Sequence, residues 1–271
     1  MSRISKTIAS LQEQGKKALI PYLVAGDPSV ALTVSLMHAL VDNGADMIEL
    51  GMPFSDPSSD GAIIQLGAER ALRAGTTLTD VFAIVKEFRT QNTQTPVVLM
   101  GYLNPIEYMG YEAFATEAEK AGVDGLLIVD LPAYECEELF AAVRPKGIDT
   151  IFLVAPTTND SRLQSICSHC TGYLYYVSLK GVTGAAISDS AAIEKKITQL
   201  RGITELPIVV GFGIKDTDSA CKMAAISDGV IVGSALVDKI SHLVADRPYS
   251  KSDLGKTVGL IGEIREAINA L

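Results

Sequence analysis

Residues 46–61 read DMIELGMPFSDPSSDG, a stretch that passes from a strand into an irregular loop. The first residues are apolar except Glu49, which fits a buried parallel strand carrying one acid. The prolines, serines and glycines that follow exclude regular structure before Gly61. An acid inside a buried strand is costly unless it is paired or protonated. The stretch therefore predicts a strand that delivers two carboxyl groups, Glu49 and Asp60, to one end of a sheet.

The same unit of strand followed by helix repeats along the chain on both sides of this stretch. Short runs rich in Val, Ile and Leu alternate with segments of helical periodicity. We expect strands at residues 18–25, 46–51, 97–102, 125–130, 149–154, 172–177, 207–211 and 228–232. We expect helices at 3–14, 29–43, 62–74, 78–91, 111–121, 135–143, about 160–170, 190–201, 215–225, 234–243 and 252–270, with a turn at Asn104-Pro105.

Eight strands that are each followed by a helix predict a (β/α)₈ TIM barrel, because right-handed crossovers repeated eight times close the sheet. The helix at 3–14 precedes every strand, so we expect it to cover the bottom of the barrel, and extra helices fall in the βα loops. No linker divides the chain, which predicts one domain over residues 1–271. The alternative is an open doubly wound sheet, but the early Gly-x-Gly-x-x-Gly motif of such sheets is missing.

The composition excludes several classes of function. The net charge of −9 argues against a general nucleic-acid surface, and no run of residues is long and apolar enough to span a membrane. The amino-terminal residues lack the apolar core of a signal peptide, so we expect a cytoplasmic protein with reduced cysteines. Cys167, His169 and Cys170 resemble half of a metal site, but no second pair completes it, so we expect no metal.

Catalytic groups of a TIM barrel lie at the carboxyl ends of its strands. Glu49 and Asp60 both belong to that face, where paired carboxyl groups serve acid–base chemistry. The alternatives are a structural ion pair for Glu49 and a turn-forming role for Asp60. The histidines fall in helical segments and the inner strands carry no lysine, so carboxylates are expected to move the protons and a Schiff base is disfavoured.

Glycines gather at the ends of the last three strands, in Gly181-Val-Thr-Gly184, Gly211-Phe-Gly213 and Gly233-Ser234. Glycine lets the backbone approach an anion, and a helix that begins there presents free N–H groups. These motifs predict a phosphate site, the alternative being that the glycines only serve tight turns. Tyr102, Asp130 and Tyr175 also fall near strand ends, where core packing or turn capping would explain them equally well.

The motifs together resemble the tryptophan synthase alpha subunit family along essentially the whole chain. The motifs that carry the resemblance are Tyr22-Leu-Val-Ala-Gly26-Asp27-Pro28, Glu49-Leu-Gly-Met-Pro53-Phe-Ser-Asp56-Pro57, Asp60-Gly61, Gly101-Tyr102, Asn104-Pro105, Asp130-Leu-Pro132 and the three glycine motifs. The resemblance implies a lyase that cleaves indole-3-glycerol phosphate to indole and glyceraldehyde 3-phosphate. It implies Glu49 as the general acid–base and Asp60 as the group that stabilises the positive indole N–H.

The resemblance also implies binding residues and a partner. The phosphate would lie against Gly184, Gly213, Gly233 and Ser234, and the indole and glycerol pocket would be formed by Tyr22, Ile64, Met100, Tyr102, Leu127, Tyr175, Thr183 and Phe212. The chain itself would hold no cofactor, because pyridoxal phosphate (PLP) belongs to the beta subunit. Asp56, Pro57 and Asn104 would face that subunit in an α2β2 complex.

The chain departs from the family pattern at two loops. Ser58, Ser59 and Ala62 stand where the family usually has Leu, Ala and Pro, and Leu179 stands where it often has Arg. These changes bear on loop closure and partner communication, because no proposed catalytic group is altered. Two alternative functions remain open: another phosphate-binding barrel enzyme, such as a sugar-phosphate isomerase or epimerase, or a non-catalytic protein that activates a beta subunit.

Overall fold

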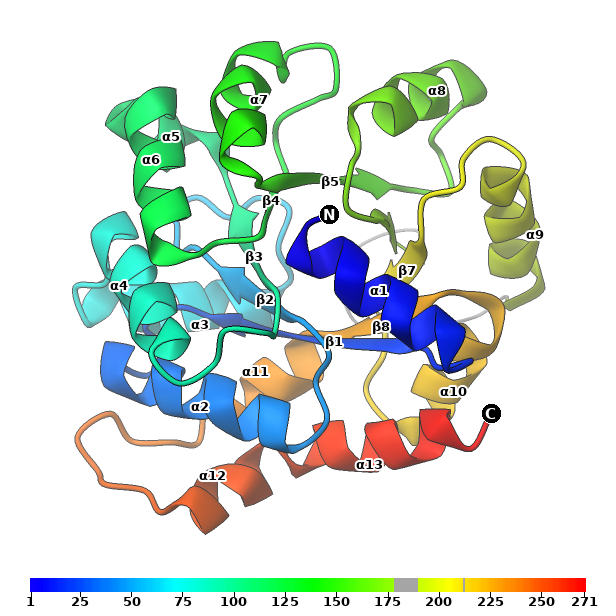
Figure 1. Ribbon diagram of the computed structural model, residues 1–271. Helices are drawn as coiled ribbons and strands as arrows, with labels where there is room; N and C mark the ends of the chain where they lie inside the picture. The colour runs from blue at the N-terminus through cyan, green and yellow to red at the C-terminus, as the bar shows by residue number, and fades with distance from the viewer. Residues whose placement is uncertain (178–189, 212) are drawn as a thin grey trace.

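The chain forms a closed barrel of parallel strands, as seen in a computed structural model that describes residues 1–177, 190–211 and 213–271 (Figure 1). Each strand pairs with the next in sequence, and the eighth pairs with the first. The strands are β1 (Ala18–Val24), β2 (Ile48–Gly51), β3 (Val97–Gly101), β4 (Gly125–Ile128), β5 (Asp149–Val154), β6 (Leu174–Val177), β7 (Ile208–Gly211) and β8 (Gly229–Val232). Each lies within a predicted strand, so the predicted (β/α)₈ barrel is confirmed.

Helices surround the barrel, and one helix crosses its end (Figure 1). The surrounding helices are α2 (Val30–Asp42), α3 (Ala62–Arg73), α4 (Leu78–Arg89), α5 (Leu103–Met109), α6 (Tyr111–Ala121), α7 (Glu137–Val143) with the 3-10 turn η1 (Arg144–Lys146), α8 (Asp160–His169), α9 (Ser190–Arg201), α10 (Thr217–Ile226), α11 (Ser234–Ile240), α12 (Lys251–Thr257) and α13 (Gly259–Asn269). Helix α1 (Arg3–Glu13) lies over the amino-terminal end of the strands, as expected. In the described ranges, no helix is both long and apolar enough to cross a membrane.

Two details differ from the prediction. A helix, α5, occupies the position of the turn expected at Asn104-Pro105. Pro105 is tolerated because it lies in the first turn, where its missing N–H leaves no helical bond unmade. The Asp130 carboxylate accepts a hydrogen bond from the Leu103 N–H at 2.9 Å, so it caps α5. The long final helix is also divided, at Val258, into α12 and α13.

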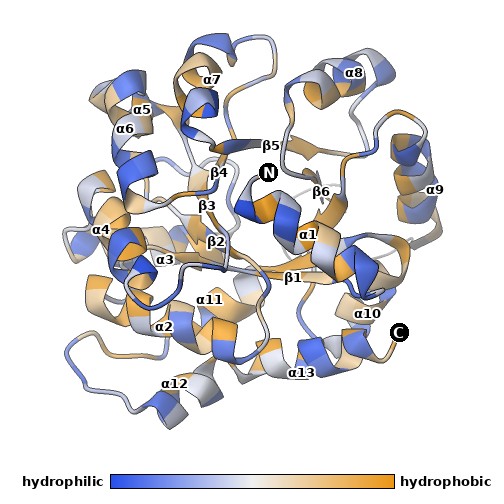
Figure 2. Cartoon of the chain, in the orientation of Figure 1, coloured by the Kyte–Doolittle hydropathy of each residue, from blue (hydrophilic) through white to orange (hydrophobic). Residues whose placement is uncertain are grey.

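The strands separate two apolar cores because their side chains alternate between the inside and the outside of the barrel. On β1, Ile20 and Tyr22 belong to the inner cluster, while Leu19 and Leu23 pack in the outer cluster under the helices. The helices turn their apolar faces to the strands and their polar faces outward (Figure 2). Ile4 of α1 belongs to the inner cluster and is fully buried, so α1 closes the barrel from below.

A buried acid joins several elements at the amino-terminal end of the strands. Asp124, which precedes β4, accepts hydrogen bonds from Arg3 at 2.7 Å, from Arg89 at 2.6 Å and from the Val97 N–H at 2.8 Å. Arg89 also donates to three backbone carbonyl groups, including that of Gly122. The side chain of Asp124 is 4% exposed, and Arg89 is 10% exposed. This network therefore ties α1 and α4 to neighbouring strands, and its bond from Arg89 is shielded from solvent, whereas Arg3 is 38% exposed.

Replacing Asp124 with Ala should lower the free energy of unfolding by about 3–5 kcal/mol, because it leaves the buried Arg89 cation without its partner. The matched control is Glu117→Ala, which removes an exposed ion pair with Lys120 and should cost less than about 1 kcal/mol. Chemical denaturation of both variants measures the two losses. Equal losses would mean that the network contributes no more than a surface pair.

Candidate active site

Glu49 lies in the middle of the barrel wall. It is in register with Tyr22 on β1 and with Val98 on β3, and its side chain is fully buried. The hydroxyl of Tyr173 donates a hydrogen bond to Oε1 at 2.5 Å, while Oε2 has no partner among the described residues. No described cation forms an ion pair with Glu49, which disfavours the alternative of a structural ion pair.

The buried position changes the acidity of Glu49. Burial raises its pKa from 4.5 to about 7, and the hydrogen bond from Tyr173 acts in the opposite direction. A carboxyl group with a pKa near 7 can both give and take a proton at neutral pH, as a general acid–base must. Oε2 is buried and accepts no hydrogen bond from the described residues, so one oxygen of the carboxyl group is not engaged by the protein. Glu49 is therefore suited to proton transfer.

Asp60 lies in the loop between β2 and α3, directly before the cap residue Gly61. The hydroxyl of Tyr102 donates to Asp60 Oδ2 at 3.0 Å and accepts a hydrogen bond from the Ser59 N–H, also at 3.0 Å. The Tyr102 ring stacks against Phe54, with 5.2 Å between the ring centroids. Burial raises the pKa of Asp60, and the hydrogen bond from Tyr102 opposes that shift. Tyr102 thus fixes both the position and the acidity of Asp60.

Two tyrosines bring the acids into one electrostatic environment. Burial raises the pKa of Tyr22 and Tyr175 well above the usual value, and the charges of Asp60 and Glu49 raise the pKa of both tyrosines further. Both rings depend on glycine in the adjacent strand. A Cβ at Gly51 would lie 2.1 Å from the hydroxyl of Tyr22, and a Cβ at Gly211 would lie 2.2 Å from that of Tyr175. The two glycines therefore leave the space that the tyrosine rings occupy.

A cavity of about 860 Å³ opens at the carboxyl ends of the strands. The predicted site residues that line it are Tyr22, Asp60, Ile64, Met100, Tyr175, Gly213, Gly233 and Ser234. Apolar side chains from β1, β3 and α3 thus face the glycines that follow β7 and β8 across one space. Such a volume and lining are typical of a small-molecule site. The cavity combines an apolar wall, a carboxylate and exposed backbone groups.

Several predicted residues do not line this cavity. Leu127 is fully buried in the inner core, Glu49 lies in the barrel wall, and Tyr102 acts through its bond to Asp60. Thr183, Gly184 and Phe212 lie outside the described residues.

The predicted phosphate end of the cavity is formed by Gly213, which follows β7, and by Gly233 and Ser234 at the start of α11. Gly213 adopts the left-handed conformation at φ +76°, which glycine accommodates without strain. Gly233 precedes the first turn of α11, whose free N–H groups begin at Ser234. Sequence reasoning missed Lys215 and Lys222, which also line this end of the cavity. Their charges are offset by three neighbouring aspartates in the lining, so the end has no strong net charge.

Of the predicted partner-facing residues, Asp56 and Pro57 lie in the loop after β2, whereas Asn104 lies in the first turn of α5. Asp56 and Asn104 are exposed, and Pro57 is half-buried. Asp56 accepts a hydrogen bond from the hydroxyl of Ser55 at 2.5 Å, and the Pro57 carbonyl accepts one from Gln65 at 3.3 Å. Asp56 and Pro57 belong to the loop that carries Asp60, and Asn104 follows β3, so none of the three follows β7 or β8 at the phosphate end.

Sequence reasoning also missed two supporting interactions. One is Tyr173, whose ring reaches Glu49 across the barrel from just before β6. The other is the pair of hydrogen bonds, both 2.8 Å long, that Arg70 of α3 donates to Asp27 beyond β1. Asp27 is 1% exposed, so this ion pair anchors α3, which carries Ile64, to the end of β1. No local motif marks either interaction, because each joins residues distant in sequence.

Among the described residues, no group of His, Cys, Asp or Glu could hold a metal ion.

Comparison with known proteins gives one consistent family. The model of the tryptophan synthase alpha chain family matches residues 8–267. A tryptophan synthase alpha chain from Marinobacter nauticus is 53% identical over all of this chain and 99% of its own length, and one from Acinetobacter baumannii is 49% identical over the full length of both. The crystal structure of the alpha subunit from Legionella pneumophila superposes with a TM-score of 0.90 at 43% identity and covers both chains completely.

Replacing Tyr173 with Phe should raise the pKa of Glu49 above its value of about 7. In the unaltered protein the hydrogen bond from Tyr173 stabilises the ionised carboxylate, and the variant lacks that bond. Carbon-13 NMR of glutamate-labelled protein can follow the titration, with Glu49→Gln identifying the signal. The control is Tyr176→Phe, whose ring packs in the outer cluster and should leave Glu49 unchanged. An unchanged or lower pKa in the Tyr173 variant would contradict the assigned hydrogen bond.

Proposed function

The chain belongs to the tryptophan synthase alpha chain family, and on that premise we propose which of its residues carry out the family's reaction. It is an indole-3-glycerol-phosphate lyase, which performs the alpha half-reaction of L-tryptophan biosynthesis. This retro-aldol cleavage yields indole and glyceraldehyde 3-phosphate. The bond between indole C3 and the glycerol carbon breaks as C3 gains a proton and the adjacent glycerol hydroxyl loses one. The net change is one proton moved between two substrate atoms, so one residue can serve both transfers.

Glu49 is proposed to move that proton. In its protonated form it donates to indole C3, and the resulting carboxylate accepts the proton of the glycerol hydroxyl as the bond breaks and the aldehyde forms. The observation that carries this proposal is the buried carboxyl group, with a pKa of about 7 and an unpartnered Oε2. A single group can alternate between acid and base only when its pKa lies near the working pH. Tyr173 holds the other oxygen and so orients the carboxyl group.

Asp60 is proposed to stabilise the positive charge that reaches the indole nitrogen when C3 is protonated. Its carboxylate lines the cavity and is held by Tyr102, so it needs no rearrangement as the charge develops. The indole ring would lie against Tyr22, Ile64, Met100 and Tyr175, which form the largely apolar wall. The family pocket residues Thr183 and Phe212, outside the described residues, belong to the same proposal.

The phosphate group is proposed to lie at Gly213, Gly233 and Ser234, with Gly184 as a further donor outside the described residues. The first turn of α11 supports this placement, because its free N–H groups favour an anion. Indole and phosphate would then occupy opposite sides of one cavity, and the glycerol chain between them would be directed toward Glu49. The reaction as proposed needs no cofactor in this chain, because the protonated indole accepts the electron pair of the breaking C–C bond and the only groups required of the protein are a proton carrier and a charge-stabilising carboxylate.

An alpha chain implies a beta subunit, and we propose an α2β2 complex in which PLP belongs to the beta subunit. Asp56, Pro57 and Asn104 would face that partner. This surface is supported by a large exposed side chain on the same helix as Asn104: Tyr108 of α5 is 95% exposed, and Tyr134, between β4 and α7, is also 72% exposed. Exposed aromatic side chains are typical of protein interfaces. A cytoplasmic location is part of the same proposal and rests on the biosynthetic role of the family.

The two alternative functions are not favoured. A sugar-phosphate isomerase or epimerase would share the glycine motifs, but the whole chain matches the alpha chain family instead. A non-catalytic activator would not need Glu49 with a pKa of about 7 and a buried, unpartnered oxygen.

Glu49→Gln should abolish release of indole from indole-3-glycerol phosphate, because glutamine cannot exchange the proton. Asp60→Asn should lower kcat/KM by a factor on the order of 10² or more, the range of a positioned charged group. Indole formation measured with and without the beta subunit tests both. The control is Glu69→Gln, an acid on an exposed position of α3 that should retain normal cleavage. Near-normal cleavage by Glu49→Gln would remove Glu49 from the mechanism.

Tyr102→Phe should move the acid limb of the kcat/KM profile to higher pH. The lost hydrogen bond normally lowers the pKa of Asp60, so its removal raises that pKa and the active carboxylate forms only at higher pH. A pH series of initial rates measures the shift. Tyr111→Phe is the matched control, because it removes a hydroxyl–carboxylate bond to Glu107 on the outer surface. A limb that stays in place, or moves to lower pH, would contradict the role of Tyr102.

A further inference from the structure

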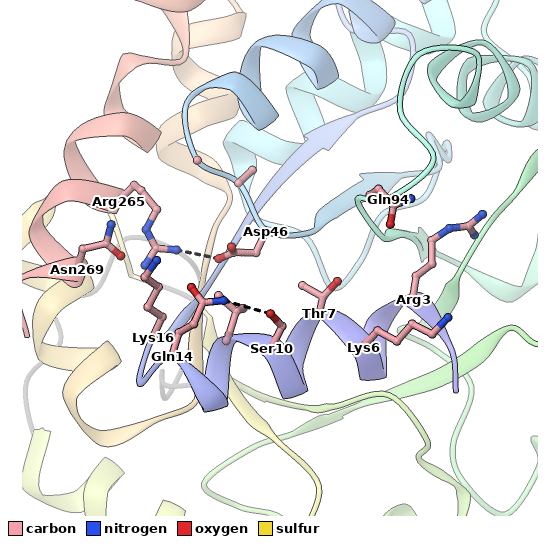
Figure 3. Close-up of a pocket in the computed structure, with 13 residues that line it drawn as sticks. Arg3, Lys6, Thr7, Ser10, Gln14, Lys16, Asp46, Gln94, Arg265 and Asn269 are labelled. Atoms are coloured by element: carbon pink, nitrogen blue, oxygen red, sulfur yellow. Dashed lines mark hydrogen bonds and ion pairs between the residues drawn. The ribbon is translucent and has the colours of Figure 1, made fainter.

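A second cavity, of about 450 Å³, lies at the opposite end of the barrel from the proposed catalytic site. It is open to solvent and is lined by α1, by the residues that lead into β2, and by α13 near the carboxyl terminus (Figure 3). Its volume is within the range of small-molecule sites. The proposed reaction uses none of its residues.

The charge of this cavity differs from that of the whole chain. Four basic side chains line it, and Asp46 is the only acid among the lining residues, although the chain as a whole carries a net charge of −9. Lys6 and Lys16 form no ion pair with any described residue, whereas Arg3 is already bound to Asp124 at 2.7 Å. Two ammonium groups are therefore available to a ligand.

The single acid is already used by the protein. Asp46 Oδ2 accepts hydrogen bonds from the Leu19 N–H and from Arg265, each at 2.8 Å. Burial raises the pKa of Asp46, while these two donors and the charge of Lys16 act in the opposite direction. Because Arg265 pairs with it, Asp46 adds no net negative charge to the cavity and does not make it a cation site.

Arg265 adds a cation that is held firmly at the edge of the cavity. Its guanidinium group donates to Asp46 and to the Lys17 carbonyl at 3.1 Å, while its Nε is buried without a hydrogen-bond partner in the described residues. The side chain is 13% exposed. The guanidinium group of Arg265 therefore neutralises Asp46, the acid of the lining, and leaves the free positive charge to the lysines.

Neutral donors complete the lining. Thr7, Ser10 and Gln14 lie on one stripe of α1, at the spacing of one helix face, while the apolar face of α1 is turned to the barrel. Figure 3 shows this stripe with Lys6 on one side of the cavity and Arg265, Lys16 and Asp46 on the other. Hydroxyl, amide and ammonium groups are the donors that an oxygen-rich anion requires.

We propose that this cavity is a binding site for a small anion that carries one or more phosphate groups. Lys6 and Lys16 provide the charge that contacts the anion, Arg265 offsets the negative charge of Asp46, and the α1 stripe provides neutral hydrogen bonds. Lysine binds phosphate as a mobile point charge, which suits the two unpaired ammonium groups. The site is separate from the phosphate end of the catalytic cavity, because the two lie at opposite ends of the strands.

Pyrophosphate titrated into the whole chain at constant ionic strength tests the proposal by site-resolved amide NMR. We expect saturable shifts at the Gly44 and Ala45 amides, which line the second cavity. The double variant Lys6→Ser/Lys16→Ser should weaken that binding at least about tenfold, since two charge contacts are lost. The amides of Gly213 and Gly233 report separately on the catalytic cavity, so failure at one site is distinguishable from failure at the other.

The matched control is Lys86→Ser/Lys256→Ser, which removes the same charge from exposed positions outside both cavities and should leave the affinity at Gly44 unchanged. Circular dichroism of both double variants establishes that each is folded. Two results would overturn the proposal: no saturable shift at Gly44 and Ala45 in the unaltered chain, or equal weakening by the two double variants.

Discussion

The structure depends on a carboxyl group, that of Glu49, held inside a closed barrel without an ion pair to any described cation. A fully ionised acid would be strongly disfavoured there, and the barrel accommodates it by raising its pKa to about 7 rather than by pairing it. One hydrogen bond from Tyr173 satisfies one oxygen, and the other remains free. Burial of Glu49 therefore has two effects: it disfavours the charged form in the folded protein, and it raises the pKa to a value at which the group can carry a proton at neutral pH.

The rest of the site follows from how side chains fill a barrel of this size. Tyr22 and Tyr175 fit because the adjacent strands end in Gly51 and Gly211, where any side chain would collide with a ring. These strand-end glycines thus support the site by leaving space, which is a different role from contact with phosphate. Asp60 reaches the same space from a loop, and Tyr102 fixes it there. The residues that fill the barrel beside the cavity are therefore the same residues that position Asp60 or lie close to the charges of the two acids.

The two ends of β2 have opposite electrostatic character. Asp46, before the strand, is neutralised by Arg265 and lies among basic side chains, whereas Glu49 within the strand is kept away from cations. At the lower end, buried ion pairs such as Asp124 with Arg89 join helices to strands. At the upper end, the ion pair of Asp27 with Arg70 anchors α3 beside the cavity. Ion pairs thus stabilise the scaffold, whereas the described residues provide no ion pair for Glu49 or Asp60 at the site.

The sequence alone determined the repeating strand and helix pattern, and with it the barrel, because periodicity and strand composition are local properties. It also marked Glu49 and Asp60, since an acid in an apolar strand and an acid in a proline-rich loop are visible without coordinates. It misplaced α5, because proline reads as a turn signal unless its position in the first helical turn is known. Only the tertiary structure decided that Tyr173 bonds Glu49, that Arg70 binds Asp27 and that α1 and α13 line a basic cavity. These contacts join residues far apart in the chain, and chain closure into a barrel is what brings them together.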